Sequence, residues 1–301
     1  MPRRLHSALL SALLLIITPA AAGVPAGAAV VERFSSDPLS GHGANPFFSE
    51  GDAGARFTFL ADAPPHFPGD RRGALRVLYD TTLPTARLST PIGQALSLDE
   101  DLSFGAILTI RSQGFAADPQ GFSQIAFGVW NAQTTGLGRT VFPSDSFDLV
   151  ELDYFPNVTA FGGPFLSPSV FGGKVDGNAF FNFAFQSQEI ALPLDVPLLC
   201  QARYEAAARR LTVTVRRHAR GPRFEAIPAA AVTLDLSSLH PTYLVDVLGI
   251  AAYGEGWASL RAEVDYDLLY LGALPPPFGV GVRSRTSMAV PDAQPGRSRN
   301  D

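Results

Sequence analysis

The residues with the clearest chemical potential lie together in the octapeptide Val150-Glu151-Leu152-Asp153-Tyr154-Phe155-Pro156-Asn157. Because alternate side chains of a β-strand share a face, we expect one face to carry Glu151, Asp153, Phe155 and Asn157. Two like charges about 7 Å apart repel each other unless a cation, a basic partner or a shared proton holds them. The pattern therefore indicates a metal site or an acid pair that acts on a sugar.

Aromatic residues in glycine-rich and proline-rich segments are the second candidate feature. Trp257 follows Gly254-Glu255-Gly256, and Phe161 and Phe165 lie in a segment that we interpret as a loop over 157–173. Aromatic rings stack on the apolar faces of sugars, so exposed rings here would make a glycan-binding surface. The alternative is that these rings fold back onto the core, and the sequence does not decide between the two.

The elements that would position these residues are almost all strands. Helical periodicity is nearly absent, and short apolar or alternating runs are separated by Gly, Pro, Asp and Asn. This pattern predicts an all-β fold in which 30–34 pairs beside 262–271 and 198–204 forms a hairpin with the run from Leu211. The expected strands are 30–34, 56–60, 75–79, 86–89, 102–111, 123–130, 147–155, 179–185, 198–204, 211–217, 231–234, 248–253 and 262–271.

Composition divides the 301 residues into three parts. Residues 1–22 resemble a secretory signal peptide, with Arg3 and Arg4 before an apolar stretch and three alanines at the end. Residues 23–274 are expected to form one β-sandwich domain, and 275–301, which begin with three prolines, a disordered tail. The domain carries 17 basic and 26 acidic side chains, a net charge of −9, which disfavours nucleic acid and anionic lipid. The only cysteine, Cys200, lies among apolar residues and is expected to be a buried, inert thiol.

The octapeptide resembles the metal-binding strand of the legume-type (L-type) lectins, within the concanavalin A-like group. The family pattern is Val-Glu-Phe/Leu-Asp-Thr-Phe/Tyr-x-Asn, from which this chain departs at Tyr154. The resemblance implies a concanavalin A-like jelly-roll β-sandwich and a calcium-supported site. In that family the Glu ligates a transition metal, the Asp bridges it to calcium, and the aromatic residue's backbone carbonyl and the Asn complete part of the calcium shell. The resemblance therefore implies that the metal ligands would be Glu151, Asp153, Phe155 and Asn157.

The chain departs from the family after this strand. Phe161 stands where the lectins have a second metal-binding Asp. The lectins also have a later His that ligates the transition metal, whereas this chain has no histidine between His66 and His218. A calcium ion would need a further donor, for which the sequence offers Asp145, Asp148 and Asp176.

The octapeptide also resembles, more weakly, the catalytic strand of the laminarinase-type glucanases. Glu151 and Asp153 match the first two acids of that strand, but Phe155 or Pro156 occupies the third position. A distant acid such as Glu255 or Asp265 would then have to supply the missing carboxylate.

Three functions are therefore compatible with the sequence. The first is a secreted, lectin-like carbohydrate-binding protein that contacts an extracellular glycan or polysaccharide through Trp257, Phe161 and Phe165. The second is a glycoside hydrolase or polysaccharide lyase that uses Glu151 and Asp153. The third is a structural or adhesive surface domain in which the two acids belong to a buried polar network. We expect a secreted or cell-surface protein with no transmembrane segment after removal of the signal peptide.

Overall fold

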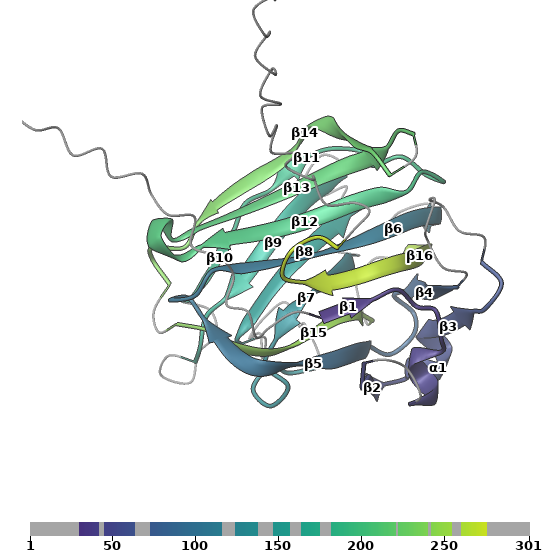
Figure 1. The fold of residues 1–301 in the computed structure, drawn as a ribbon, viewed down its shortest axis with the longest axis horizontal. Coiled ribbons are helices and arrows are strands. Elements are labelled where there is room, and N and C mark those ends of the chain that lie inside the picture. The colour runs from purple at the N-terminus through teal and green to yellow at the C-terminus, as the bar shows by residue number, and fades with distance from the viewer. Residues whose placement is uncertain are drawn as a thin grey trace, which may run out of the picture.

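The computed structural model describes residues 30–41, 45–63, 73–115, 124–137, 147–156, 164–174, 182–220, 222–239, 242–254 and 260–275. Two antiparallel sheets of eight strands each face one another and form a β-sandwich (Figure 1). This arrangement confirms the predicted fold class. Among the described residues, no helix is long and apolar enough to cross a membrane.

Sheet A contains both ends of the described chain. Strand β1 pairs with β16, which confirms the predicted pairing of the terminal strands. The order across sheet A is β14 (Phe224–Asp235), β13 (Arg210–His218), β12 (Leu198–Glu205), β6 (Leu102–Phe115), β16 (Leu260–Leu271), β4 (Ala74–Asp80) and β3 (Phe57–Leu60), and β1 (Val30–Glu32) is the eighth strand. The predicted hairpin is β12 and β13, joined by the 3-10 turn Ala206–Ala208.

Sheet B contains the acidic strand, β8, near its middle. Its order is β10 (Phe183–Phe185), β9 (Phe165–Phe171), β8 (Leu149–Phe155), β7 (Ile125–Trp130), β15 (Leu244–Ala252), β5 (Ala86–Ser97) and β2 (Phe48–Gly51), and β11 (Gln188–Glu189) also pairs with β9. The only other regular elements of the described chain are the short helix α1 (Ala53–Arg56) and the 3-10 turn Pro38–Ser40.

Strand β9 lies where we predicted a loop, so that interpretation of 165–171 is wrong. Proline weakens the strand signal because it cannot donate a ladder hydrogen bond. Along the edge of β9 that does not pair with β8, the short strand β11 pairs with residues 165–166 and the short strand β10 pairs with residues 169–171. Pro168 falls in the interval between these two partners, which is a position where a strand tolerates proline.

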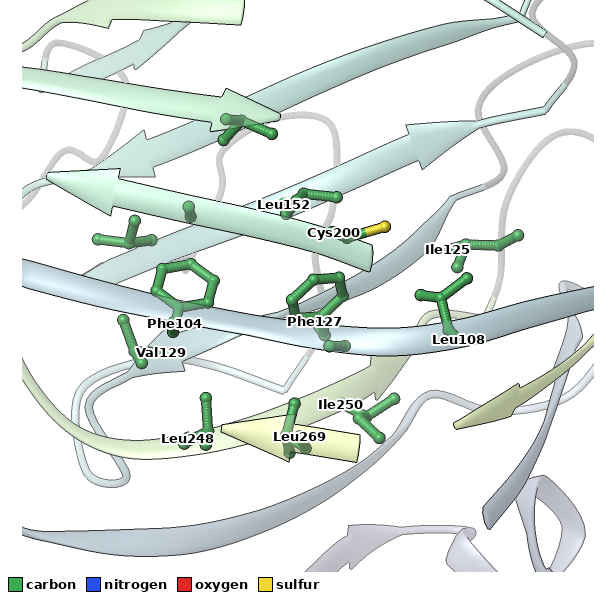
Figure 2. Close-up of a cluster of buried hydrophobic side chains, with 14 of the residues drawn as sticks. Phe104, Leu108, Ile125, Phe127, Val129, Leu152, Cys200, Leu248, Ile250 and Leu269 are labelled. Atoms are coloured by element: carbon green, nitrogen blue, oxygen red, sulfur yellow. The ribbon is translucent and has the colours of Figure 1, made fainter. Parts of the chain in front are cut away.

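The main core fills the space between the sheets. Figure 2 shows Phe104, Leu108, Cys200 and Leu269 of sheet A against Phe127 and other side chains of sheet B. Phe104 and Phe127 meet edge to face, with ring centroids 6.1 Å apart. The predicted burial of Cys200 is confirmed, and burial raises the pKa of its thiol to about 12.

Candidate functional site on the outer face of sheet B

The acidic pair lies on the face of sheet B that points away from the sandwich core. Val150, Leu152 and Tyr154 belong to the main core, so the alternating residues Glu151 and Asp153 point outward. The shared face predicted for the two acids is therefore confirmed. Asn157 lies outside the described residues.

A continuous row of paired residues passes through Glu151 and crosses seven of the eight strands of the sheet, all except β11. Its ends are aromatic and its middle consists of small or acidic residues. The row runs Phe48, Ser89, Gly249, Gly128, Glu151, Ser169, Phe185. The next row contains Asp153, between Ala126 and Ser167.

Both acids are completely buried, and each accepts a hydrogen bond from a hydroxyl group. Glu151 and Asp153 are 0% exposed. The Tyr253 hydroxyl donates to Glu151 Oε1 at 2.6 Å, and the Ser169 hydroxyl donates to Asp153 Oδ2 at 2.7 Å. Hydrogen bonds to a charged acceptor are short and about twice as strong as neutral ones, so these hydroxyls offset part of the cost of burying the carboxylates.

Two glycines of the row make room for the larger side chains. A Cβ atom on Gly128 would lie 2.2 Å from the carbonyl oxygen of Val150 and 2.9 Å from Cα of Glu151. A Cβ atom on Gly249 would lie 2.5 Å from the carbonyl oxygen of Leu88 and 2.6 Å from the ring of Trp130. The outer face can therefore accommodate the Trp130 ring and the Glu151 side chain only because these two positions lack a side chain.

A second, smaller apolar cluster lies on the outer face beside the acids. It is separate from the main core, and the partly buried Phe171 packs against it. Its buried members are Ala126, Trp130, Leu149, Val247, Ala251 and Tyr253. Because Tyr253 is also the donor to Glu151, the acid is part of an enclosed network rather than of an open surface.

Exposed aromatic rings lie at the β10 edge of the same face. Phe185 is 58% exposed and Phe183 is 38% exposed. The ring of Phe183 stacks on Phe171 at 5.7 Å and on Phe185 at 5.6 Å, with interplanar angles of 22° and 8°. This stack was not predicted from the sequence, although the alternation Phe183-Ala184-Phe185 places both rings on one face of a strand.

The predicted sugar-contacting residues are only partly described. Phe165 lies at the opposite end of β9 from Phe171, is half-buried, and stacks on Phe155 at a centroid distance of 4.7 Å. Phe161 and Trp257 lie outside the described residues. Phe165 belongs to the same outer face but not to the β10 stack, since six residues of strand span about 20 Å.

The two acids alone do not fit a calcium ion. Among the described residues, no group of three or more His, Cys, Asp or Glu side chains could hold a metal. Calcium takes six to eight oxygen ligands, and one oxygen of each carboxylate already accepts a hydroxyl hydrogen bond. A shell at this strand would have to draw on Asn157 and on other donors beyond the described ranges.

Two further acids considered from the sequence have structural roles elsewhere. Asp148, which has a left-handed φ of 51°, accepts hydrogen bonds from the Thr134 hydroxyl and the Leu244 amide. Asp265 lies on sheet A and binds Arg76 and Arg111, so it does not supply the third carboxylate of a glucanase-like site. Asp145, Asp176 and Glu255 lie outside the described residues.

Comparison with known proteins gives similarity of fold only. No protein-family model matches the chain, and no curated protein matches it. Among solved structures, the carbohydrate recognition domain of Emp47p is 11% identical, with a TM-score of 0.48 over 85% of this chain and 99% of its own. The exoplasmic/lumenal domain of VIP36, in a Ca²⁺/Man3GlcNAc-bound form, is 13% identical, with a TM-score of 0.37 over 75% of this chain and 89% of its own.

A carbohydrate esterase from the Shiga toxin-encoding bacteriophage phi24B is also similar. It is 12% identical, with a TM-score of 0.41 over 75% of this chain and 88% of its own.

Proposed function

We propose that this protein is a secreted carbohydrate-binding protein whose ligand contacts the outer face of sheet B at the β10 edge. The observation that carries this proposal is the stack of Phe171, Phe183 and Phe185, which ends in a ring that is 58% exposed. Exposed rings of this size in a row are costly in water unless a ligand covers them.

The chemistry of the stack suits a sugar. The axial C–H groups of a pyranose make an apolar face that lies flat on an aromatic ring. Neighbouring rings that are nearly parallel present a continuous surface to consecutive sugar units. In this proposal Phe165 extends the same face, and Phe161 and Trp257 are further contacts.

Secretion and calcium are the finer parts of the proposal. The secretory character of residues 1–22 supports an extracytoplasmic location, where glycans and polysaccharides are the available ligands. The octapeptide supports a calcium ion held by Asp153, Phe155 and Asn157, with Glu151 as a further metal ligand. Sugar binding at the β10 edge does not require that ion, because the stack is built from aromatic side chains alone.

The geometry gives no comparable support to a hydrolase. A carboxylate that protonates or attacks a glycosidic bond must contact the substrate. Glu151 and Asp153 are both completely buried and hydrogen-bonded to hydroxyl groups. Their geometry is that of a buried polar network, which the exposed stack flanks.

Glycan binding by three forms of the protein tests the proposal. The wild type, Phe185→Ser and the matched control Phe48→Ser are compared on a glycan array, and affinities are then measured by calorimetry. Phe48 is also an exposed phenylalanine of this row, at the opposite edge of the sheet and 37% exposed. We expect Phe185→Ser to lose affinity by about tenfold or more and Phe48→Ser to bind as the wild type. Absence of glycan binding by the wild type, or equal binding by all three, would overturn the proposal.

A further inference from the structure

Strands β10 and β11 are two parts of one edge strand of sheet B. Both pair with β9 in the same register, so the chain passes from β10 to β11 without a shift. The break between them, at residues 186–187, falls opposite Pro168, which has no N–H group to donate. Side chains of this edge therefore keep the alternation of a single strand from Phe183 to Glu189. The pairs across the edge are Phe183–Phe171, Ala184–Val170, Phe185–Ser169, Gln188–Leu166 and Glu189–Phe165.

Four residues of this edge share the outer face and form what we call the edge row. All four are exposed. The alternate residues Ala184 and Ile190 pack against the main core instead. On the neighbouring strand β9, the outward residues Ser167 and Ser169 are buried, so the exposed path follows the edge row and does not cross the sheet. The edge row consists of Phe183, Phe185, Ser187 and Glu189.

The edge row is apolar at one end and polar at the other. The rings of Phe183 and Phe185 are nearly parallel, with an interplanar angle of 8°. A serine hydroxyl donates and accepts hydrogen bonds, and a carboxylate accepts them through two oxygens. Within the described chain, the side chain of Glu189 takes part in no ion pair. A sugar has two matching features, an apolar C–H face and hydroxyl groups at its rim.

The length of the edge row sets the size of a ligand that contacts both of its ends. Phe185 and Glu189 are four residues apart, about 13 Å along the strand. A single pyranose ring is about as wide as a phenylalanine ring, so one sugar on Phe185 does not reach Glu189. An oligosaccharide spans the distance if its chain is extended, whereas a curved chain leaves the straight row.

We propose that the edge row binds an extended, neutral oligosaccharide whose chain runs parallel to β10 and β11. This proposal rests on the proposed carbohydrate-binding function and specifies the shape and length of its ligand. One sugar unit lies on Phe185, the next lies beside Ser187, and a unit further along donates hydroxyl hydrogen bonds to the Glu189 carboxylate. An acidic sugar at that last position is disfavoured because like charges repel. A single terminal sugar fills only the Phe185 end.

Two series of glucose oligomers separate the length of the ligand from its shape. Cello-oligosaccharides are β-1,4-linked and extended, whereas malto-oligosaccharides are α-1,4-linked and curved, and both consist of the same sugar. Each series, from glucose to the hexasaccharide, is titrated into the protein by calorimetry. We expect the affinity for the cello series to rise about tenfold between the disaccharide and the tetrasaccharide and then to level off. The malto series should show no such rise.

Glu189→Ala gives the sharpest readout because only the longer ligands reach that residue. It should weaken binding of cellotetraose about fivefold and leave the affinity for cellobiose unchanged. Phe185→Ser should weaken binding of both, because both ligands contact the ring. Glu205→Ala is the matched control, since Glu205 is an acid of sheet A whose side chain is 46% exposed, and it should bind both ligands as the wild type does.

The outcomes separate this inference from the proposed function. An affinity that does not change with ligand length, an equal rise in the malto series, or the same effect of Glu189→Ala on cellobiose and cellotetraose would overturn the extended site. Absence of binding by both series would overturn it as well. Each of these results is compatible with other glycans that bind through Phe185, so the proposed function would stand. Absence of any glycan binding that depends on Phe185 would remove both.

Discussion

The hydroxyl of Tyr253 lies 2.6 Å from Glu151 Oε1 and joins two residues that are 102 positions apart in the chain. Tyr253 immediately follows β15, whereas Glu151 is in β8, with β7 between the two strands. The hydrogen bond therefore spans three strands on the outer face of sheet B. It also connects the acid to the small apolar cluster and, through the tyrosine ring, to Arg87.

Replacing Tyr253 by phenylalanine should lower the free energy of unfolding more than the same replacement at a tyrosine that donates to a neutral acceptor. The substitution removes the hydroxyl donor from a buried carboxylate, which should lower the free energy of unfolding by about 1.5–3 kcal/mol. Tyr204→Phe is the control, because the buried Tyr204 hydroxyl donates at 2.8 Å to a neutral acceptor, the carbonyl of Leu98. That loss should be about 0.5–1.5 kcal/mol. Urea denaturation measures both losses, and an equal or smaller loss for Tyr253→Phe would show that the Tyr253–Glu151 hydrogen bond is no stronger than the hydrogen bond of Tyr204.

Gly128 should not tolerate even alanine. The added Cβ would meet the backbone of Val150 and Glu151, which cannot rotate away as a side chain could. We expect Gly128→Ala to destabilise the protein by about 1–3 kcal/mol. In Gly54→Ala, the added Cβ has no atom within 4 Å and lies in α1, where alanine is the better helix former.

Thermal unfolding of the two glycine variants provides the comparison. The melting temperature of Gly128→Ala should fall, and that of Gly54→Ala should stay level or rise. Equal melting temperatures for the two variants would show that the β7–β8 spacing is looser than the structure indicates.

The face on which the two acids of β8 lie was predictable from the sequence. The residues that donate hydrogen bonds to these acids were not. Alternation in 150–155 gave the correct face for both acids, because the period of a strand is a local property. The donors Ser169 and Tyr253 come from other strands, so their roles depend on register across the sheet. Strand β9 was not predicted because Pro168 is a residue typical of loops. The strand tolerates this proline because residue 168 lies between the segments of β9 that pair with β11 and with β10.

Arg87 illustrates the same limit. Its segment was correctly expected to be a strand, but a single arginine among Ala86, Leu88 and Ser89 gives no sign of burial. Only the packing of Trp130 and Tyr253 beside it shows that the charge is enclosed.

If a calcium ion binds at β8, the melting temperature of the protein should depend on calcium. Calcium that binds only the folded chain raises the melting temperature, by an amount that grows with its concentration. The rise should disappear with EDTA and in Asp153→Asn, whereas magnesium should give little effect because it demands a tighter, octahedral shell. An unchanged melting temperature in calcium and in EDTA would exclude metal support, and Glu151 and Asp153 would then belong to a purely hydrogen-bonded network.

The Asp265 network on sheet A should control stability at low pH. Burial acts to raise the pKa of Asp265, but the hydrogen bonds and charges of Arg76 and Arg111 outweigh it, and the pKa is lowered below its ordinary range. A lowered folded-state pKa means that the network contributes stability above the unfolded pKa of about 4, and that this contribution is lost as the pH falls through the folded value. Arg76 and Arg111 are 36% and 28% exposed, and each keeps a second acidic partner, Glu263 for Arg76 and Asp195 for Arg111. Asp265→Asn should therefore cost about 1–3 kcal/mol at neutral pH, less than the loss of a fully buried ion pair.

That deficit should begin to narrow below about pH 4 and should disappear as the pH falls through the lowered folded-state pKa of Asp265, where the wild type also loses the charge. The measurement is the free energy of unfolding in urea at a series of pH values for the wild type, Asp265→Asn and the exposed control Asp99→Asn. The Asp99→Asn curve should run parallel to that of the wild type. A deficit of Asp265→Asn that stays constant from neutral to acid pH would mean that its effect comes from packing, and that the two arginines do not hold Asp265 in its charged form.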